Sequence, residues 1–371
     1  MKTEQQEIIY TRIADVDTSW MKSFNTDLID GFLQNGVKLT VIPERAAEED
    51  QSENTAFMHK LSVLESFSEI KVSGKDILFV SCPLRCSLDQ LVWSLEVVKQ
   101  EKPFIACYTL TGTFIEEDWV TFYTPWVSHL EKVWYEKSDA IFVPTEYFKQ
   151  KMIEQGYSQE KISVVGFPLN SERITAGSQP RDKNLIIFNH RLNIDKKPNY
   201  FLRMVRDLSG QFPNLEFIIS TSLNEGDFWS SADSDTIIDL KNTLARFQSS
   251  RIQFNKSKEE YFRLLNKAYL APCFATHETF GVSVAESLAA GCLPIIPSRL
   301  TYPELVQKDT DLLYSSSENL ERDYEAALEK VIYWLSHPEL GEKKSLEIKK
   351  YAEQFQPKKV TARILNQLFP I

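Results

Sequence analysis

Two glutamates separated by seven residues stand out in the segment from His277 to Glu304, HETFGVSVAESLAAGCLPIIPSRLTYPE. The segment follows the apolar run YLAPCFA, and its pattern predicts a helix over residues 282–290. Glu278 then lies in the loop before the helix. Glu286 lies about one and a half turns into it, roughly 6–8 Å from its start. At that separation one carboxylate can meet a sugar while the other meets the ribose of the same nucleotide.

The start of this predicted helix is suited to an anion. Phe280, Gly281 and Val282 form it. A glycine here lets a ligand approach the backbone closely. The free N–H groups and the positive end of the helix favour phosphate.

Two cations occupy a second loop, FNHRLNIDKKP, which begins at Phe188 after the first apolar run of the second half. Arg191 and Lys196 are five residues apart and precede a predicted helix. Two cations at such a place can neutralise a diphosphate leaving group. Alone, such a pair is more typical of surface charge. With the Glu278 loop, both features follow predicted strands of one domain.

The elements that must position these loops alternate between strand and helix along the whole chain. Strands are predicted at residues 8–13 and 39–42, and in apolar runs that begin at Asp76, Pro103, Asp139 and Ile162. Helices are predicted around residues 20–32, 88–99, 125–135 and 146–154. The polar segment 170–182 contains Gly and Pro and is the predicted linker. A second series follows, with helices at 198–212, 237–247 and 258–268.

This alternation predicts an α/β fold with parallel sheets. The expected architecture is two Rossmann-like domains facing across a cleft, over residues 1–168 and 169–356. A helix over about 357–371 is expected to pack back on the first domain. Ligands of open parallel sheets bind beyond the carboxyl ends of the strands.

Charge is unevenly distributed. The 371 residues carry a net charge of −10. Residues 1–170 hold 16 basic and 26 acidic residues, whereas the remainder holds 26 of each. An acidic half disfavours a protein that holds nucleic acid through phosphates alone. It leaves room for a local basic groove.

Several patterns are missing from the sequence. It has no apolar stretch near the ~20 residues of a membrane helix and no signal-peptide pattern at its start. We therefore expect no membrane partner and a cytoplasmic location, in a host cell if the source is a phage.

The D-x-D pairs at Asp15, Asp233 and Asp309 fall in unrelated contexts, and turns are enriched in Asp. No metal requirement and no tightly bound cofactor are predicted. No pattern indicates an oligomeric state.

The segment from His277 to Glu304 resembles the glutamate–seven–glutamate signature of retaining GT-B glycosyltransferases of the family-four type, and the Arg191–Lys196 loop is similar to theirs. The resemblance covers most of residues 162–310, and the first half matches only in outline. It implies transfer of a hexose from an NDP-sugar co-substrate, with a UDP-sugar favoured. Two departures are visible. The first strand–helix loop, TRIADVDTSW, lacks glycines, and Asn255 and Lys256 stand where many members have a glycine, which leaves base recognition open.

The resemblance also implies roles for particular residues. Arg191 and Lys196 would hold the diphosphate, and Glu278 with the Phe280–Gly281 backbone would hold the sugar. Glu286 would hold the ribose. The other donor-binding candidates are His190, His277, Thr279, Val282, Asn255 and Lys256. For both histidines a structural role is equally consistent with the sequence. The acceptor-binding candidates are Thr111, Gly112, Thr113, Glu116, Asp118 and Trp119, although a simple capping turn explains that loop equally well.

The combination of the two loops is similar to glycosyltransferases that decorate modified nucleobases. Those include tRNA-queuosine mannosyltransferases and phage enzymes that act on hydroxymethylated pyrimidines in DNA. A modified nucleobase in DNA or tRNA is thus the leading acceptor. The alternatives are a glycan, a protein or a small molecule. A further alternative is a sugar-nucleotide binder or epimerase of the same fold, which would not transfer the sugar.

Overall fold

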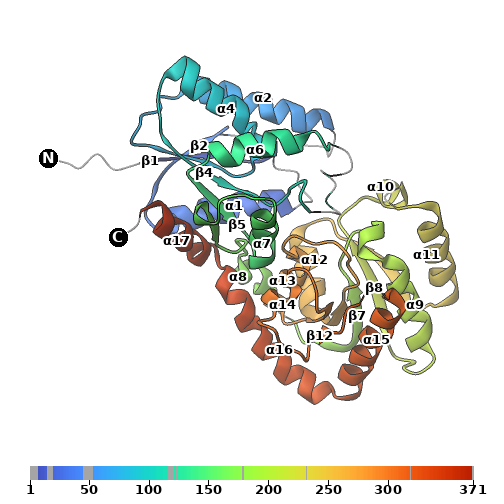
Figure 1. The fold of residues 1–371 in the computed structure, drawn as a ribbon. Coiled ribbons are helices and arrows are strands. Elements are labelled where there is room, and N and C mark those ends of the chain that lie inside the picture. Colours follow the sequence, from blue (N-terminus) through green and yellow to red (C-terminus); the bar gives the residue numbers. More distant parts are fainter. Residues whose placement is uncertain are drawn as a thin grey trace. The chain divides into compact units, whose positions relative to one another are not determined.

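The computed structural model describes residues 7–14, 20–44, 53–115, 118, 121, 124–177, 179–230, 232–317 and 319–369. The chain divides into two compact units. One comprises Met1–Leu169 with Phe355–Ile371, and the other comprises Asn170–Gln354. Each contains one six-stranded parallel sheet flanked by helices (Figure 1). In the described ranges, every helix is too short or too polar to cross a membrane.

The sheet of the first unit has the strand order β2-β1-β3-β4-β5-β6. The strands are β1 (Glu7–Thr11), β2 (Lys38–Ile42), β3 (Ile77–Val80), β4 (Phe104–Tyr108), β5 (Ala140–Val143) and β6 (Ile162–Val164). The order reverses between β1 and β3. This is the flavodoxin-like variant of the doubly wound sheet, whereas the classic Rossmann order reverses after a third strand. The predicted α/β class with parallel sheets is confirmed. The order of the strands was not predicted and is known only from which strands pair in the structure.

The helices of the first unit are α1 (Trp20–Gln34), α2 (Glu53–Glu69), α3 (Pro83–Cys86), α4 (Leu88–Trp93), the π-helical η1 (Ser94–Lys99), α6 (Val127–Lys137), α7 (Glu146–Glu154), the 3₁₀ turn η2 (Gln159–Lys161) and α17 (Pro357–Leu368). The sequence did not predict α2. Its apolar side chains lie on opposite faces, with Val63 and Phe67 buried and Phe57 and Leu61 exposed. No single apolar stripe marks it as a helix.

The C-terminal helix α17 packs against α1, although more than three hundred residues separate them (Figure 1). A Cβ on Gly31 would lie 2.6 Å from the Pro357 carbonyl oxygen, so only glycine permits this approach. Asn35 Nδ2 donates to the Lys358 carbonyl at 3.0 Å and to Thr361 Oγ1 at 2.8 Å. The end of the chain therefore completes the first unit.

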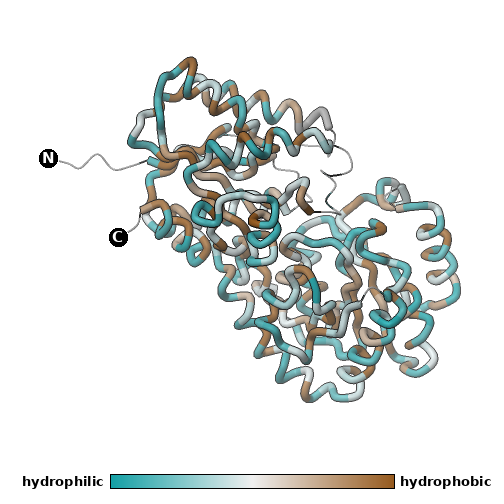
Figure 2. The backbone as a smooth tube through the Cα atoms, viewed as in Figure 1, coloured by the Kyte–Doolittle hydropathy of each residue, from teal (hydrophilic) through white to brown (hydrophobic). Residues whose placement is uncertain are grey.

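The sheet of the second unit has the order β12-β11-β10-β7-β8-β9, which is the classic Rossmann order. The strands are β7 (Asp182–Phe188), β8 (Glu216–Thr221), β9 (Ser250–Phe254), β10 (Ala268–Pro272), β11 (Leu293–Pro297) and β12 (Leu313–Tyr314). Figure 2 shows hydrophobic stretches along the strands and mixed colouring along the surrounding helices. The order reverses where β7 and β10 lie side by side, which is where such sheets bind ligands.

The helices of the second unit are α8 (Ser171–Thr175), the 3₁₀ turn η3 (Ile194–Lys196), α9 (Pro198–Ser209), α10 (Glu225–Ser230), α11 (Ser234–Arg246), α12 (Lys258–Lys267), α13 (Val282–Ala290), α14 (Tyr302–Leu305), α15 (Leu320–Ser336) and α16 (Pro338–Ala352), followed by η4 (Glu353–Phe355). Helix α13 has its predicted bounds. The predicted linker, however, contains α8. It is an ordered part of the second unit because Ile174 is buried and its carbonyl accepts a 2.6 Å hydrogen bond from Asn266.

Candidate functional site

Two loops of the second unit meet at the carboxyl ends of β7 and β10. The β7 loop carries His190, Arg191 and Lys196, and the β10 loop carries His277 and Glu278. Lys196 Nζ donates to the His277 carbonyl at 2.6 Å, across 81 residues of chain. The two loops that the sequence singled out separately therefore form one cluster.

Lys196 is the centre of this cluster and is only 5% exposed. Its ammonium lies 3.3 Å from Glu278 Oε2 and 3.1 Å from Asp195 Oδ2, besides its bond to His277. Burial would lower the pKa of Lys196, but the two carboxylates raise it above its ordinary value. The ammonium of Lys196 donates to the His277 carbonyl and to Glu278 and forms an ion pair with Asp195, so its charge is balanced inside the protein.

The Glu278 carboxylate is held in its ionised form. Burial would raise its pKa, but Lys196, His190 and His277 hold the pKa below its usual range. Glu278 Oε1 also accepts the backbone N–H of Thr279 at 3.2 Å. An ionised carboxylate only accepts hydrogen bonds, so the group is suited to the hydroxyls of a sugar.

His190 belongs to the same cluster, a point that the sequence left open. It is 8% exposed, and its Nδ1 lies 3.0 Å from Ser283 Oγ on α13. Burial, together with the charge of Lys196, lowers the pKa of His190 to about 4. The imidazole is therefore neutral near pH 7 and can contribute a hydrogen bond but no charge.

Arg191 differs from Lys196 in its exposure to solvent and in its hydrogen bonding. It is exposed, and its side chain makes no hydrogen bond or ion pair within the described ranges. The sequence treated the two cations as equivalent. In the structure Lys196 holds the two loops together, while Arg191 is the cation that remains available to a phosphate.

The N-terminus of α13 lies directly after Glu278 in the chain. Gly281 is its N-cap and has φ +92°. A Cβ there would lie 3.1 Å from Leu305 Cδ1 and 3.2 Å from Tyr302 Cε1, so glycine is required by both conformation and space. Phe280, the residue before Gly281, has a buried ring. The N–H groups of the first turn lack helical acceptors and favour an anion.

Glu286 lies on α13 and is 5% exposed. Its Oε1 is 3.0 Å from Lys258 Nζ, and its Oε2 accepts the hydroxyl of Tyr261 at 2.9 Å. Asn189 in turn donates to the Tyr261 oxygen at 3.1 Å. Lys258 and Tyr261 are site residues that the sequence reasoning missed. Nothing in their spacing shows that α12 reaches α13, although the Ser257–Glu260 capping pair marks where α12 begins.

The residues after β9 were expected to contact the donor. Asn255 is 6% exposed, and its side chain donates to Ser220 Oγ at 2.9 Å and to the Thr221 carbonyl at 3.1 Å. Lys256 has an exposed side chain, and its backbone N–H donates to Glu260 Oε2. In this structure Asn255 ties β8 to β9, and the side chain of Lys256 is exposed.

The predicted acceptor loop follows β4 in the first unit. Gly112 N–H donates to Asp118 Oδ2 at 3.2 Å, and Thr113 N–H donates to Glu131 Oε1 at 2.8 Å. Asp118 is 1% exposed, so it holds the loop from inside instead of facing an acceptor as expected. The carbonyl of Thr111 accepts the Thr109 hydroxyl. Glu116 and Trp119 lie outside the described residues. The described contacts are those of a capped turn.

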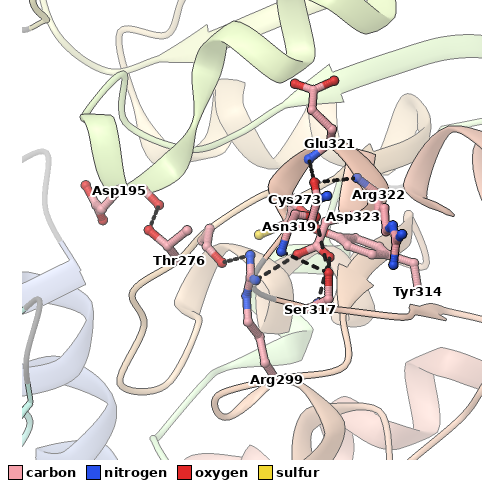
Figure 3. Close-up of polar contacts among 11 residues, drawn as sticks. Asp195, Cys273, Thr276, Arg299, Tyr314, Ser317, Asn319, Glu321, Arg322 and Asp323 are labelled. Atoms are coloured by element: carbon pink, nitrogen blue, oxygen red, sulfur yellow. Dashed lines mark hydrogen bonds and ion pairs between the residues drawn. The ribbon is translucent and has the colours of Figure 1, made fainter. Parts of the chain in front are cut away.

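Hydrogen bonds on both sides fix the β10 loop (Figure 3). The Asp195 carbonyl accepts the N–H of Thr276 at 2.8 Å. Arg299, after β11, donates to the Ala275 carbonyl at 3.3 Å and to Asp323 Oδ2 on α15 at 2.8 Å. The loop that carries Glu278 is therefore held before any ligand binds.

Two of the D-x-D pairs have structural partners. Asp233 caps α11 by accepting Thr236 N–H, and Asp309 and Asp311 both pair with Lys344. Asp15 and Asp17 lie outside the described residues. Over the described ranges, His, Cys, Asp and Glu side chains nowhere gather in threes that could hold a metal ion.

A family model described as "Glycosyl transferases group 1" matches residues 171–355. A curated relative, the tRNA-queuosine alpha-mannosyltransferase of Drosophila melanogaster, is 27% identical over 184 residues. That alignment covers 47% of this chain and 46% of the relative, so it spans about half the relative's length.

Solved structures share the fold at low identity. A sucrose-phosphate synthase from Thermosynechococcus elongatus matches with a TM-score of 0.73 at 12% identity, covering 98% of this chain and 99% of that one. The Anabaena protein HepE in complex with UDP and glucose has a TM-score of 0.69 at 11% identity, with 99% and 100% covered. A pneumococcal O-GlcNAc transferase in complex with UDP and GlcNAc has a TM-score of 0.61 at 17% identity, covering 83% and 59%. The fold is therefore that of the GT-B glycosyltransferases.

Proposed function

We propose that this chain, whose residues 171–355 belong to the glycosyl transferases group 1, moves a hexose from an NDP-sugar to an acceptor hydroxyl with retention of configuration. The observation that carries the proposal is the cluster at β7 and β10. There a buried Lys196–Glu278 pair, the free cation Arg191 and the N-terminus of α13 converge at the reversal point of a Rossmann sheet.

The donor would lie across this cluster. Its diphosphate would meet the first turn of α13 and the guanidinium of Arg191. Lys196 is already paired with Asp195 and Glu278, so a phosphate oxygen of the entering donor would have to compete with these two carboxylates for its ammonium. Glu278 would accept hydroxyls of the sugar. The neighbours that bind UDP, with glucose or GlcNAc, favour a UDP-sugar.

The reaction needs stabilisation of charge more than covalent help from the protein. The bond between the sugar C1 and the diphosphate oxygen breaks, and the acceptor oxygen bonds to C1 on the same face. The acceptor proton passes to the departing diphosphate. Arg191 and the α13 N-terminus would stabilise the negative charge that develops on the leaving group. The fixed loops would supply orientation.

A modified nucleobase is the acceptor that we propose. The similarity to a tRNA-queuosine alpha-mannosyltransferase supports it, because the name of that relative describes transfer to a modified base in tRNA. The acidic balance of residues 1–170 stands against extensive phosphate contacts, so the proposed acceptor would be recognised mainly through the base itself.

The test is release of nucleoside diphosphate from a panel of UDP- and GDP-sugars by the purified protein. Queuosine-containing tRNA, hydroxymethylated DNA and simple glycans would be added in parallel. Release stimulated by queuosine tRNA or hydroxymethylated DNA, with the sugar recovered on the base in the anomeric configuration of the donor, supports the proposal. Stimulation by glycans alone would contradict the acceptor. Interconversion of the donor sugar without transfer would indicate an epimerase.

A further inference from the structure

Exposed apolar side chains gather on three helices of the first unit. Across the described ranges fourteen large apolar side chains are exposed, and eight of them lie on α2, on α4 with η1, and on α6 with its N-cap. These eight, here called the apolar patch, are Phe57, Met58, Leu61, Trp93, Val97, Val98, Trp126 and Val133. The proposed transfer reaction uses none of them.

The three helices cover the same face of the sheet. They belong to crossovers that run in one direction along the strand order, from β2 to β3, from β3 to β4 and from β4 to β5. Because such crossovers are right-handed, their helices lie on one face. The helices also touch (Figure 1): Trp134 on α6 donates to Asp89 on α4 at 3.1 Å, and Lys99 at the end of η1 donates to the Ile70 carbonyl just after α2 at 2.8 Å. Their outward sides therefore adjoin one another.

A helix that packs on a sheet needs one apolar face, but these helices have two. On α2, Val63 and Phe67 are buried, whereas Phe57 and Leu61 lie on the opposite side and are exposed. On the mostly buried α4, Trp93 is exposed. Folding of the first unit accounts for the inner faces only, and a large outer apolar face is typical of an interaction site.

The area of the apolar patch is that of a stable dimer interface. Its side chains are between 40% and 63% exposed. An aromatic side chain carries about 150–250 Å² and an aliphatic one somewhat less, so eight of them at about half exposure present roughly 600–900 Å². The largest apolar patch of an ordinary monomer is about 300–600 Å², whereas a specific interface buries about 800 Å² on each partner.

Charges beside the apolar patch suit a second copy of the same chain. On α6, Lys132 and Glu136 flank Val133, both are exposed, and neither forms an ion pair within the described ranges. A two-fold axis uses each residue pair twice, so Lys132 of each copy can meet Glu136 of the other. A membrane with anionic lipids fits less well, because residues 1–170 hold 16 basic and 26 acidic residues.

We propose that the protein forms a two-fold symmetric dimer in which the apolar patches of two copies pack against each other. Because α4 lies between α2 and α6, Trp93 and Val97 lie near the centre of this interface. Aromatic side chains at the centre of an interface supply much of the binding energy. The association needs no nucleotide, so it is independent of the proposed function.

The experiment is sedimentation equilibrium of the purified full chain, without ligands, over a range of concentrations. The wild-type protein should be a dimer at about 10 µM, since interfaces of this size have micromolar to picomolar dissociation constants. Trp93→Ala and Val97→Glu should each raise the dissociation constant by about 30-fold or more, the usual effect at an interface centre. The matched control is Leu346→Glu on α16, a leucine that is 70% exposed outside the apolar patch, and it should stay dimeric.

Reversal of charge tests the two-fold arrangement. Lys132→Glu and Glu136→Lys should each weaken the dimer, and the double variant should restore most of the affinity. Circular dichroism of every variant checks that the fold persists, as expected for substitutions at exposed positions. A double variant as weak as the single ones would overturn the pairing of Lys132 with Glu136.

Three other results would overturn the dimer through the apolar patch. The first is a wild-type protein that stays monomeric at about 100 µM. The second is a dimer that withstands both Trp93→Ala and Val97→Glu, or that Leu346→Glu dissociates to the same extent. The third is open-ended aggregation of the wild-type protein without a discrete dimer, which would show that the apolar patch is not a specific interface.

Discussion

At the scale of single residues, the site separates two cations that look alike in the sequence. Lys196 is buried, donates to the His277 carbonyl and pairs with Glu278 and Asp195, whereas Arg191 is exposed and makes no hydrogen bond or ion pair within the described ranges. A cation in the first situation stabilises the loops, and one in the second is available to a ligand. Substitution of the two should therefore have different consequences.

Arg191→Ala should lower turnover by about 10²–10³-fold, the usual cost of losing one group that stabilises developing charge. The melting temperature should hardly change, because the exposed side chain makes no hydrogen bond or ion pair within the described ranges. Steady-state release of nucleoside diphosphate measures the turnover, and thermal unfolding measures the melting temperature. Arg322→Ala, an exposed arginine on α15, is the matched control. Turnover unchanged in Arg191→Ala would remove the arginine from the mechanism.

His190 makes stability depend on pH. Its pKa is lowered to about 4 in the folded state by burial and Lys196, against about 6.5 when unfolded. Above pH 6.5 both states are neutral and the full stability is present. As the pH falls from 6.5 towards 4, the unfolded state binds the proton first, so stability is lost, by about 2 kcal/mol at pH 5.

The check is urea unfolding at pH 7.5 and pH 5.0 for the wild-type protein and for His190→Asn. The loss between the two pH values should be smaller in the variant by about 2 kcal/mol. The other histidines and the carboxylates are common to both proteins and cancel in the comparison. An identical loss in both would show that His190 titrates normally.

At the scale of elements, helix α13 depends on one residue at its start. Gly281 has φ +92°, and a Cβ there would press on Leu305 and Tyr302. A side chain would have to adopt a left-handed conformation and displace α14, so the first turn of α13 would shift relative to Glu278.

Gly281→Ala should cost about 1–2 kcal/mol in the free energy of unfolding and weaken nucleotide binding as well. Gly210→Ala provides the contrast, since Gly210 has φ −77° and open space around its Cβ position. That variant should be neutral or slightly stabilised. For both variants, urea unfolding measures the free energy of unfolding and calorimetry measures the affinity for UDP. Normal nucleotide affinity in a destabilised Gly281→Ala would argue against binding at the α13 start.

At the scale of the whole molecule, charge distribution bears on how an acceptor is recognised. Residues 1–170 are strongly acidic and the remainder is balanced. A protein that neutralises six to ten phosphates loses about 10³–10⁵ in affinity between about 50 and 200 mM salt. This chain lacks the excess of cations for that mode.

Transfer to an oligonucleotide acceptor should therefore depend weakly on salt, with kcat/KM falling less than about tenfold over the same range. The isolated modified nucleoside, which carries no phosphate, is the control and should show no loss. A steep fall with the oligonucleotide alone would mean that a local basic groove, and not the base, provides most of the affinity.

The sequence by itself determined the α/β class, the bounds of α13 and the membership of both loops in the candidate site. These follow from local patterns, such as apolar periodicity, a glycine before a helix and charged residues after strands. It missed α2, whose apolar residues face both ways, and it took α8 for part of a linker, because one buried isoleucine gives no pattern.

Only the tertiary structure decided what contacts what. Strand order placed β7 beside β10, which joined Lys196 to Glu278 across the chain. The tertiary structure also shows that Asp118 is buried and that Lys258 lies beside Glu286. The physical reason is that these contacts join residues far apart in sequence, or depend on burial. Residue type and spacing then leave several partners open, and packing selects one.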